Sequence, residues 1–587
     1  MNAERSSHTG RRPVYRRALA AAVLIYLFTG SSLFAQTPTI SERLPQDTVF
    51  YVQWRGKAFL GNADKKNHIL QLLEDPDFDA VRQTLAKDLL QQQAKDGSPA
   101  PPIQLSDLIS LLDNPAAAGF IAGSTPPKGD SPGASSPLGS VFFVYELTGK
   151  ADLIQKLKTA AQAGSKEKPQ ITTYNFGGTS IEVRTEGANA NTSYSARTSH
   201  YFIFASQKET IEDLVTRFGG ASKPADSVVQ LPEYQAIRPY IGSDAAVEYF
   251  ARIPNLEKWT PSTAGGQQAA KFIRNVHLDK IHVAGGGISF SGEALHTHGA
   301  ILGDASAGSL FDIAGTSSAK FETQQVISAS SYFSLSRFNF TSLYQIVRDG
   351  MLGAATPQQA AGLTGAEAMA QGFLGMSIAD AFQLFTGEVA SQGSFTADGE
   401  SQQMYVLSIQ KPQDVLRLLR ATLTKAIAAE DTSGDTTYLD LSYPFHDPTT
   451  GQDRRTFYYV AVTPQFIMEA PRKAMLRDAV AQINGKTASA TGTSIFVNAD
   501  FVHLRSLMPE KLSGLGGADM SQIPWDKIIV RYAQQMEQAA KQANQKSPPS
   551  TEWLHSVKPA MFNRHLHAAA SGWWKDSNGI YFDYYVQ

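Results

Sequence analysis

Two pairs of histidines have a spacing that could bind a metal ion. One residue separates His296 from His298, and one residue separates His565 from His567. Because alternate residues of a β-strand point to the same face, each pair could present two imidazole rings to zinc. The two pairs do not occupy corresponding places in the internal repeat described below, which favours ordinary histidines on partly exposed strands. We therefore predict no cofactor and no metal site, and keep His296 and His298 as the candidates for one.

Two Ser-x-x-Lys sequences have the spacing at which a lysine one helical turn away can activate a serine nucleophile. They are Ser165 with Lys168 and Ser317 with Lys320, each in a loop-like context without companion motifs. The glycine run 285–287 lacks the lysine and hydroxyl residue of a phosphate-binding loop. We interpret the serine–lysine matches as coincidental and the glycines as a place of close strand packing or a bulge. No residue is predicted to be catalytic.

Aromatic residues are concentrated in the last predicted hairpin, around an Asn-Gly turn. Trp573 and Trp574 precede the turn, and Tyr581, Phe582 and Tyr585 follow it. Strand alternation puts the two tryptophans on opposite faces and separates Phe582 from both tyrosines. One face must be buried by the neighbouring domain, or the two tryptophans and two tyrosines must form a surface for a partner. We predict that Phe582 packs into the second core.

The elements that carry these residues occur twice along the chain. Each copy has a β-rich run ending in arginine, a short helix before a small-residue strand, a strand followed by a helix, and a terminal hairpin. Six matched blocks in the same order indicate an internal duplication. The blocks are 44–55 with 326–337, 105–120 with 376–390, 143–154 with 405–416, 201–218 with 465–483, 247–251 with 495–499, and 281–287 with 566–572.

Length and pattern predict an α+β protein of two tandem duplicated units, each a mixed or antiparallel sheet with packed helices. The 587 residues divide into a first unit at 36–310 and a second unit at 311–587. The run 354–375 is either a marginal helix or a mobile cover. Four segments are helical by periodicity, namely 78–93, 151–163, 413–428 and 525–543.

Charge and cysteine content exclude several classes of function. The formal net charge is -2, from 52 basic and 54 acidic side chains, so no overall field attracts nucleic acid or anionic lipid. The chain contains no cysteine, which excludes disulfides, thiolate metal sites, cysteine nucleophiles and a lipoprotein anchor. Stability must therefore come from packing.

The amino terminus has the pattern of an export signal. Arginines at positions 11, 12, 16 and 17 precede an apolar core over 18–28, and polar residues end this core before Ala35. We predict that 1–35 is a cleaved signal peptide and that the mature protein is periplasmic or secreted, with an uncleaved anchor as the alternative. No second apolar stretch approaches the roughly 20 residues that span a bilayer, so no stable membrane span is predicted after cleavage.

The opening Leu-Pro-Gln-Asp-Thr-Val-Phe-Tyr-Val at 44–52 follows this signal closely. It resembles the start of a family of bacterial exported proteins that carry a domain of unknown function and that are similar in repeating a strand-and-helix plan. The second copy departs from the motif, with Ile327 in place of the proline and Ala329 in place of the aspartate. The resemblance implies no catalytic residue.

Two functions of different class follow from these observations. The duplicated plan, the balanced charge and the lack of a convergent catalytic set favour a non-catalytic binding or scaffolding protein of the cell envelope, whose partner is an unknown envelope protein or ligand. The alternative is an exported hydrolase with a site assembled from distant residues. An enzyme should bring two or more titratable groups with perturbed pKa values together in a cleft.

Overall fold

The structure is a computed structural model of the chain. The predicted signal peptide and the serine–lysine match of Ser165 and Lys168 lie outside the described residues. The structure describes residues 39–61, 63–95, 104–122, 139–163, 169–186, 191–220, 224–253, 264–304, 308–327, 331–446, 453–485, 494–542 and 552–587.

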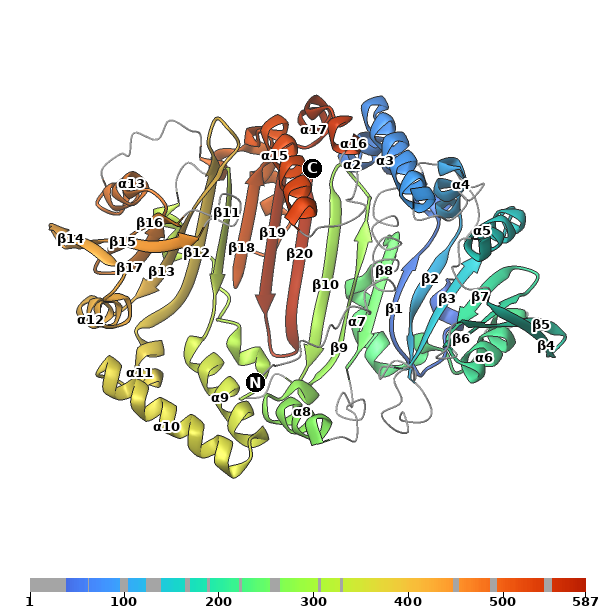
Figure 1. Cartoon of the computed structure of the whole chain (residues 1–587), viewed down its shortest axis with the longest axis horizontal. Coiled ribbons are helices and arrows are strands. Elements are labelled where there is room, and N and C mark those ends of the chain that lie inside the picture. The colour runs from blue at the N-terminus through green and yellow to red at the C-terminus, as the bar shows by residue number, and fades with distance from the viewer. Residues whose placement is uncertain are drawn as a thin grey trace, which may run out of the picture.

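The described residues form one antiparallel sheet of twenty strands (Figure 1). The strands are β1 (Thr48–Trp54), β2 (Ala116–Ile121), β3 (Ser140–Glu146), β4 (Gln170–Phe176), β5 (Thr179–Glu186), β6 (Asn191–Arg197), β7 (Tyr201–Ala205), β8 (Val247–Arg252), β9 (Ile281–Ser289), β10 (Leu295–Gly303), β11 (Tyr332–Arg337), β12 (Phe385–Phe395), β13 (Ser401–Ile409), β14 (Ile427–Ser433), β15 (Thr436–His446), β16 (Asp453–Val462), β17 (Phe466–Ala470), β18 (Gly514–Asp519), β19 (Ala568–Lys575) and β20 (Gly579–Val586).

The strand order reads the same way from both edges of the sheet. From one edge the order is β4-β5-β6-β7-β3-β2-β1-β8-β9-β10. From the other edge it is β14-β15-β16-β17-β13-β12-β11-β18-β19-β20. The two series meet where β10 pairs with β20. The predicted α+β class is therefore confirmed, and the sheet is antiparallel rather than mixed.

Helices pack on both faces of this sheet and around the ends of its central strands (Figure 1). The α-helices are α2 (His68–Glu74), α3 (Pro76–Lys95), α4 (Leu105–Ser110), α5 (Ala151–Ala163), α6 (Lys208–Gly219), α7 (Pro232–Ile241), α8 (Ala264–Asn275), α9 (Phe340–Ala354), α10 (Pro357–Leu374), α11 (Ile378–Gln383), α12 (Pro412–Leu423), α13 (Lys473–Ile483), α14 (Ala499–Ser506), α15 (Trp525–Gln542), α16 (Glu552–His555) and α17 (Pro559–His565). Short 3-10 helices include η5 (Val228–Gln230), η9 (Glu322–Val326) and η10 (Ile495–Val497).

One face of the central strands carries the main cores, and we call it the covered face. Helix α7 lies on β8, β9 and β10, and α14 lies on β18 and β19. The first core includes Tyr51, Phe250 and Tyr581. The second core includes Phe501 and Tyr585. Strand β20 therefore contributes to both cores, which makes the β10–β20 junction part of the packed interior.

The helical predictions hold for three of the four segments, which correspond to α3, α5 and α15. The run 354–375 contains a helix, α10. The fourth prediction, 413–428, extends too far, because α12 ends at Leu423 and the chain enters β14 at Ile427, where it pairs with β15. Local periodicity was overridden there by an available neighbouring strand.

One of the six matched blocks is wrong. Residues 247–251 lie in β8, but 495–499 do not form a strand. Ser494 accepts a hydrogen bond from the backbone N–H of Phe496 at 3.3 Å, and Asn498 accepts one from that of Phe501 at 3.0 Å. These polar caps start η10 and α14 instead. The place of β8 in the second series is taken by β18, whose Gly-Leu-Gly-Gly sequence lacks a strand-like pattern.

Within the described part of the chain, no helix combines the length and apolar character needed to cross a membrane.

Candidate functional site

The predicted histidines His296 and His298 lie on the covered face at the junction of the two strand series. His296 pairs with Tyr585 across β10 and β20, and its ring stacks on the tyrosine with centroids 4.1 Å apart. Its Nε2 lies 2.9 Å from an oxygen of Asp583. Burial and then the neighbouring His296 lower the pKa of His298. No group of three or more His, Cys, Asp or Glu side chains in the described residues could hold a metal ion.

The second histidine pair contacts the amino-terminal helices. His565 Nε2 lies 2.9 Å from a carboxylate oxygen of Asp75, which follows α2. The ring of His567 meets the ring of His68 edge-on, with centroids 4.9 Å apart. Arg564 donates to both carboxylate oxygens of Asp75, at 3.0 and 2.8 Å. These residues therefore fasten the last helix of the chain to the first ones.

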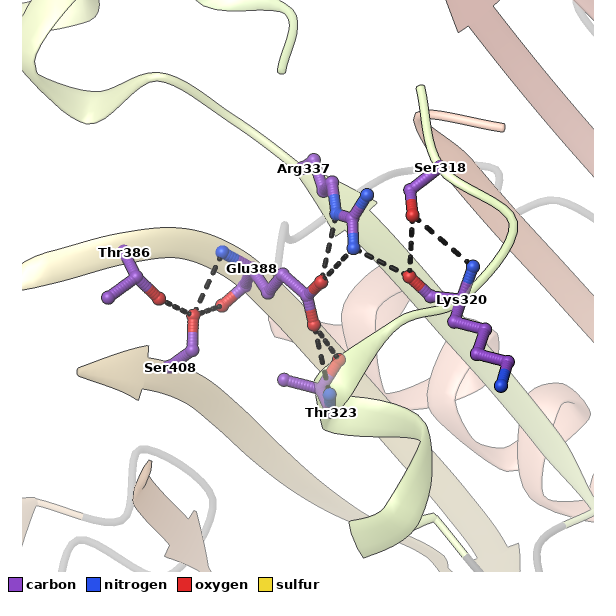
Figure 2. A network of polar contacts seen from close by, with 7 residues as sticks. All are labelled: Ser318, Lys320, Thr323, Arg337, Thr386, Glu388 and Ser408. Carbon is purple, nitrogen blue, oxygen red and sulfur yellow. Dashed lines mark hydrogen bonds and ion pairs between the residues drawn. The ribbon is translucent and has the colours of Figure 1, made fainter. Parts of the chain in front are cut away.

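The described serine–lysine match does not form a nucleophilic pair. The Oγ of Ser317 lies 2.9 Å from the Oγ of Ser513. Lys320 contributes its backbone to a polar network, and Figure 2 shows its side chain pointing away from Ser318.

A buried carboxylate on β12, Glu388, is the centre of the network in Figure 2. Its Oε1 accepts hydrogen bonds from Nε of Arg337, at 2.8 Å, and from Nη2. Its Oε2 accepts bonds from the backbone N–H and the hydroxyl of Thr323, at 2.9 and 3.2 Å. Arg337 also donates to the carbonyl of Lys320 at 2.6 Å. Since each carboxylate oxygen has two donors, Glu388 fastens η9 to β11 and β12.

The first half contains a second buried carboxylate, Glu248 on β8, whose side chain is 0% exposed. Its Oε1 accepts the hydroxyls of Tyr51 and of Tyr234, the latter at 2.9 Å. Its Oε2 lies 3.4 Å from Nη2 of Arg55. Burial, followed by the charge of Glu248, raises the pKa of both tyrosines, so both stay protonated and donate. This carboxylate also serves to hold core elements together.

The opposite face of the central strands has a different character, and we call it the open face. Cross-strand pairing defines three rows of side chains that run perpendicular to the strands. Two rows cross twelve neighbouring strands from β3 to β13, and the first row crosses the eight strands from β3 to β19. The only charged member of these rows is Lys575. The first row is Val141, Phe120, Phe50, Ala251, Ala284, Ile301, Ile580 and Lys575; the second is Phe143, Ala118, Val52, Tyr249, Gly286, Gly299, Phe582, Trp573, Gly514, Ser336, Val389 and Leu407; the third is Tyr145, Ala116, Trp54, Val247, Ile288, Thr297, Tyr584, Ser571, Gly516, Ser334, Ser391 and Tyr405.

Aromatic rings on the open face lie over glycines of the neighbouring strands. A β-carbon on Gly299 would lie 2.6 Å from Cζ of Phe582, its cross-strand partner. A β-carbon on Gly514 would lie 1.8 Å from Nε1 of its partner Trp573. Tyr249 likewise lies over its cross-strand partner Gly286. A β-carbon on Gly286 would lie 2.3 Å from the hydroxyl oxygen of Tyr249. Glycine thus lets each ring lie across the sheet.

A fourth pair of this kind lies next to the rows. The ring of Tyr332 covers its partner Gly393, and its hydroxyl lies 2.6 Å from the Oγ of Ser401. All four rings are half-buried, so part of each aromatic surface faces outward. Tyr249, Phe582 and Trp573 share the second row, and we call these three side chains the aromatic row. It is a partly exposed, uncharged surface on paired strands, which suits it for binding rather than for proton transfer.

The predicted aromatic candidates separate between the two faces. Trp573 lies on the open face, and Trp574 stacks on Tyr581 with centroids 5.7 Å apart on the covered face. Tyr581 is 2% exposed and Tyr585 is 8% exposed, so neither offers a surface to a partner. The prediction that Phe582 packs into the second core is wrong, because the two tyrosines take that side of β20.

Sequence reasoning missed Tyr249 and Tyr332, and it missed the role of Phe582. Tyr249 lies in β8, far from the terminal hairpin in sequence. The available signal was the repeated occurrence of glycine within strand-like runs, such as 285–287 and 514–517. Glycine inside a strand marks a close approach. Which ring makes that approach depends on the strand register, which the sequence alone does not provide.

No protein-family model, no curated protein and no solved structure matches this chain.

Proposed function

We propose that this protein is an exported, non-catalytic binding protein of the cell envelope that binds an uncharged ligand on its open face. The single observation that carries the proposal is the aromatic row, Tyr249, Phe582 and Trp573. Ligand sites are lined mainly by apolar and aromatic side chains on rigid elements. The export signal predicted over 1–35 supports the location outside the cytoplasm.

Two duplicated units, joined at the β10–β20 pair, are part of this proposal. The identical strand order from both edges supports it. A matched turn before β7 and β17 supports it further. The backbone N–H of Thr198 donates to the carbonyl of Tyr201 at 2.9 Å, and that of Thr463 donates to the carbonyl of Phe466 at 2.8 Å. In both turns the threonine hydroxyl also accepts the N–H of the aromatic residue, at 3.0 and 2.9 Å.

The hydrolase alternative rests on residues distant in sequence that meet in the fold. His296 and Asp583 form such a pair, as do His565 and Asp75. Within the described ranges, neither imidazole hydrogen-bonds a serine or threonine hydroxyl, so neither pair has an activated nucleophile. Both carboxylate networks are used to hold elements together. The binding function is therefore the one that the geometry favours.

The proposal is tested with N-phenyl-naphthylamine, an uncharged probe whose fluorescence rises in apolar surroundings. The chain without residues 1–35 should bind it in a saturable manner. Trp573→Ala and Phe582→Ala should each weaken binding about tenfold, because an aromatic contact and its buried area together contribute on the order of 1 to 2 kcal/mol.

The matched control is Phe373→Ala, which removes an exposed aromatic side chain on α10, away from the open face. It should leave probe binding unchanged. Equal affinities for the original chain and both open-face variants, at unchanged urea midpoints, would reject the open face as the binding surface.

A further inference from the structure

The open face differs in polarity between its two ends, and this difference indicates which ligand it takes. On β3, β2, β1 and β8, the rows consist mainly of apolar side chains such as Val141, Phe143, Phe120, Phe50 and Val52. Tyr249 is an exception, and its hydroxyl already donates to the carbonyl of His298, at 3.2 Å. This end of the open face therefore offers van der Waals contact and little hydrogen bonding.

The other end carries hydroxyl groups on β19, β11, β12 and β13. They belong to Ser571, Ser334, Ser336, Ser391 and Tyr405. In the described part of the chain, none of these hydroxyls hydrogen-bonds another side chain, and Tyr405 is 45% exposed. Each hydroxyl can both donate and accept. This end therefore offers several hydrogen-bonding hydroxyls. Its one charged row member, Lys575, donates to the carbonyl of Phe311 and lies 3.5 Å from a carboxylate oxygen of Asp312, so its charge is already paired.

The dimensions of the rows favour a long, narrow ligand. Twelve antiparallel strands, each about 4.8 Å from the next, give a length of roughly 50 Å. From β3 to β19, three rows on alternate residues span about 13 Å along the strands. The third row is buried at the β3–β1 corner, where Tyr145 is 2% and Trp54 is 6% exposed, so the strip available there consists of the first two rows. Since every strand in this stretch is paired on both sides, no backbone edge is free to bind an extended peptide by strand addition.

We propose that the ligand is a long, uncharged amphiphile that lies across the strands, with its hydrocarbon part over the β3–β8 end and a hydroxylated, uncharged headgroup over the β19–β13 end. This inference rests on the proposed function and adds the class and orientation of the ligand. The absence of charge from all but one position of the rows matches an uncharged headgroup, and the aromatic row connects the two ends.

The test uses dodecyl maltoside, below the concentration at which it forms micelles, as competitor of N-phenyl-naphthylamine. Dodecyl maltoside should displace the probe, whereas maltose should not. The double variant Ser334→Ala with Tyr405→Ala should weaken dodecyl maltoside binding about tenfold through lost hydrogen bonds. Phe373→Ala, on α10 and outside the rows, should leave the binding of both ligands unchanged. Val52→Ser, at the apolar end, should weaken both ligands.

The outcomes separate the two proposals. If the probe binds in a Trp573-dependent manner but dodecyl maltoside binds equally well to the double variant, the amphiphile inference fails and the binding function stands. If Trp573→Ala does not affect the probe, the proposed function itself fails. Displacement of the probe by an unfolded apolar polypeptide but not by dodecyl maltoside would overturn the amphiphile. The amphiphile inference would also be overturned if the protein self-associates, if this self-association blocks probe binding, and if Trp573→Ala abolishes it.

Discussion

The two faces of the central strands use glycine in opposite ways. On the covered face, a β-carbon on Gly287 would lie 2.1 Å from the carbonyl oxygen of Ile241, because α7 packs directly against the strand. On the open face, a β-carbon on Gly514 would lie 1.8 Å from Nε1 of Trp573. The first glycine admits another segment of backbone, and the second admits an aromatic ring. The same residue type therefore permits core packing on one face and a ring-lined surface on the other.

The faces also differ in how they carry charge. The covered face contains the carboxylates of Glu248 and Glu388, each held by hydrogen-bond donors from several elements. The open-face rows contain a single charged residue, Lys575, whose Nζ donates to the carbonyl of Phe311 at 2.6 Å. Buried charge is tolerated where it is paired. With the proposed function, this difference predicts that substitutions on the covered face act on stability and that those on the open face act on binding.

The largest expected effect separates two adjacent residues of β20. Tyr581→Ala should lower the free energy of unfolding by about 3 to 5 kcal/mol, because it removes a buried aromatic side chain from the first core. Phe582→Ala should cost only about 1 kcal/mol, because its ring is half-buried on the open face. Urea midpoints of both variants check this comparison. Equal shifts would show that the two faces are buried alike.

This pair of residues also shows what the sequence could provide. Strand alternation correctly separated Tyr581 from Phe582 and Trp573 from Trp574, since it depends only on backbone geometry. It did not identify which side was buried, because that depends on where α7 and α14 pack. Strand β18 was missed, since glycine is uncommon in strands and its glycines are explained only by the rings that pack on them, Trp573 on Gly514 and Phe501 on Gly517.

The networks of the covered face give the next largest effect. Glu388→Ala should lower the free energy of unfolding by about 3 kcal/mol, because Arg337 is left half-buried without its counter-charge. Ser391→Ala, on the open face of the same strand, should change stability by less than about 0.5 kcal/mol. Chemical denaturation of the two variants measures both effects. A stable Glu388→Ala protein would show that the network contributes little.

Glycine substitutions should give smaller shifts that still distinguish the faces. Gly287→Ala should cost about 2 kcal/mol, because the new methyl group meets the backbone of Ile241. Gly514→Ala should cost less than about 1 kcal/mol, because the ring of Trp573 can move away. The displaced ring should nevertheless reduce N-phenyl-naphthylamine binding. If both variants lose the same stability and Gly514→Ala binds normally, the ring does not contribute to the surface.

The smallest expected effect is that of pH on binding. Burial raises the pKa of Tyr249 from its ordinary value of 10.0 to about 12, so the hydroxyl in the aromatic row stays neutral. Because the hydroxyl of Tyr249 carries no charge in this range, probe affinity should be constant between about pH 5 and 9. A binding change in that range would point to the histidines of the covered face.

Tyr249 also makes the free energy of unfolding depend on pH, and the direction follows from its raised pKa. Its pKa is higher in the folded state, so its contribution to stability is fully present below about pH 10 and is lost as the pH rises from about 10 to 12. Tyr249→Phe should reduce this alkaline loss of stability, and urea midpoints measured at pH 9 and 11 test it. The substitution keeps the ring over Gly286, so probe affinity at neutral pH should be retained. An unchanged alkaline loss would mean that other buried tyrosines dominate it, whereas lost probe binding would assign the hydroxyl of Tyr249, rather than its ring, to the open face.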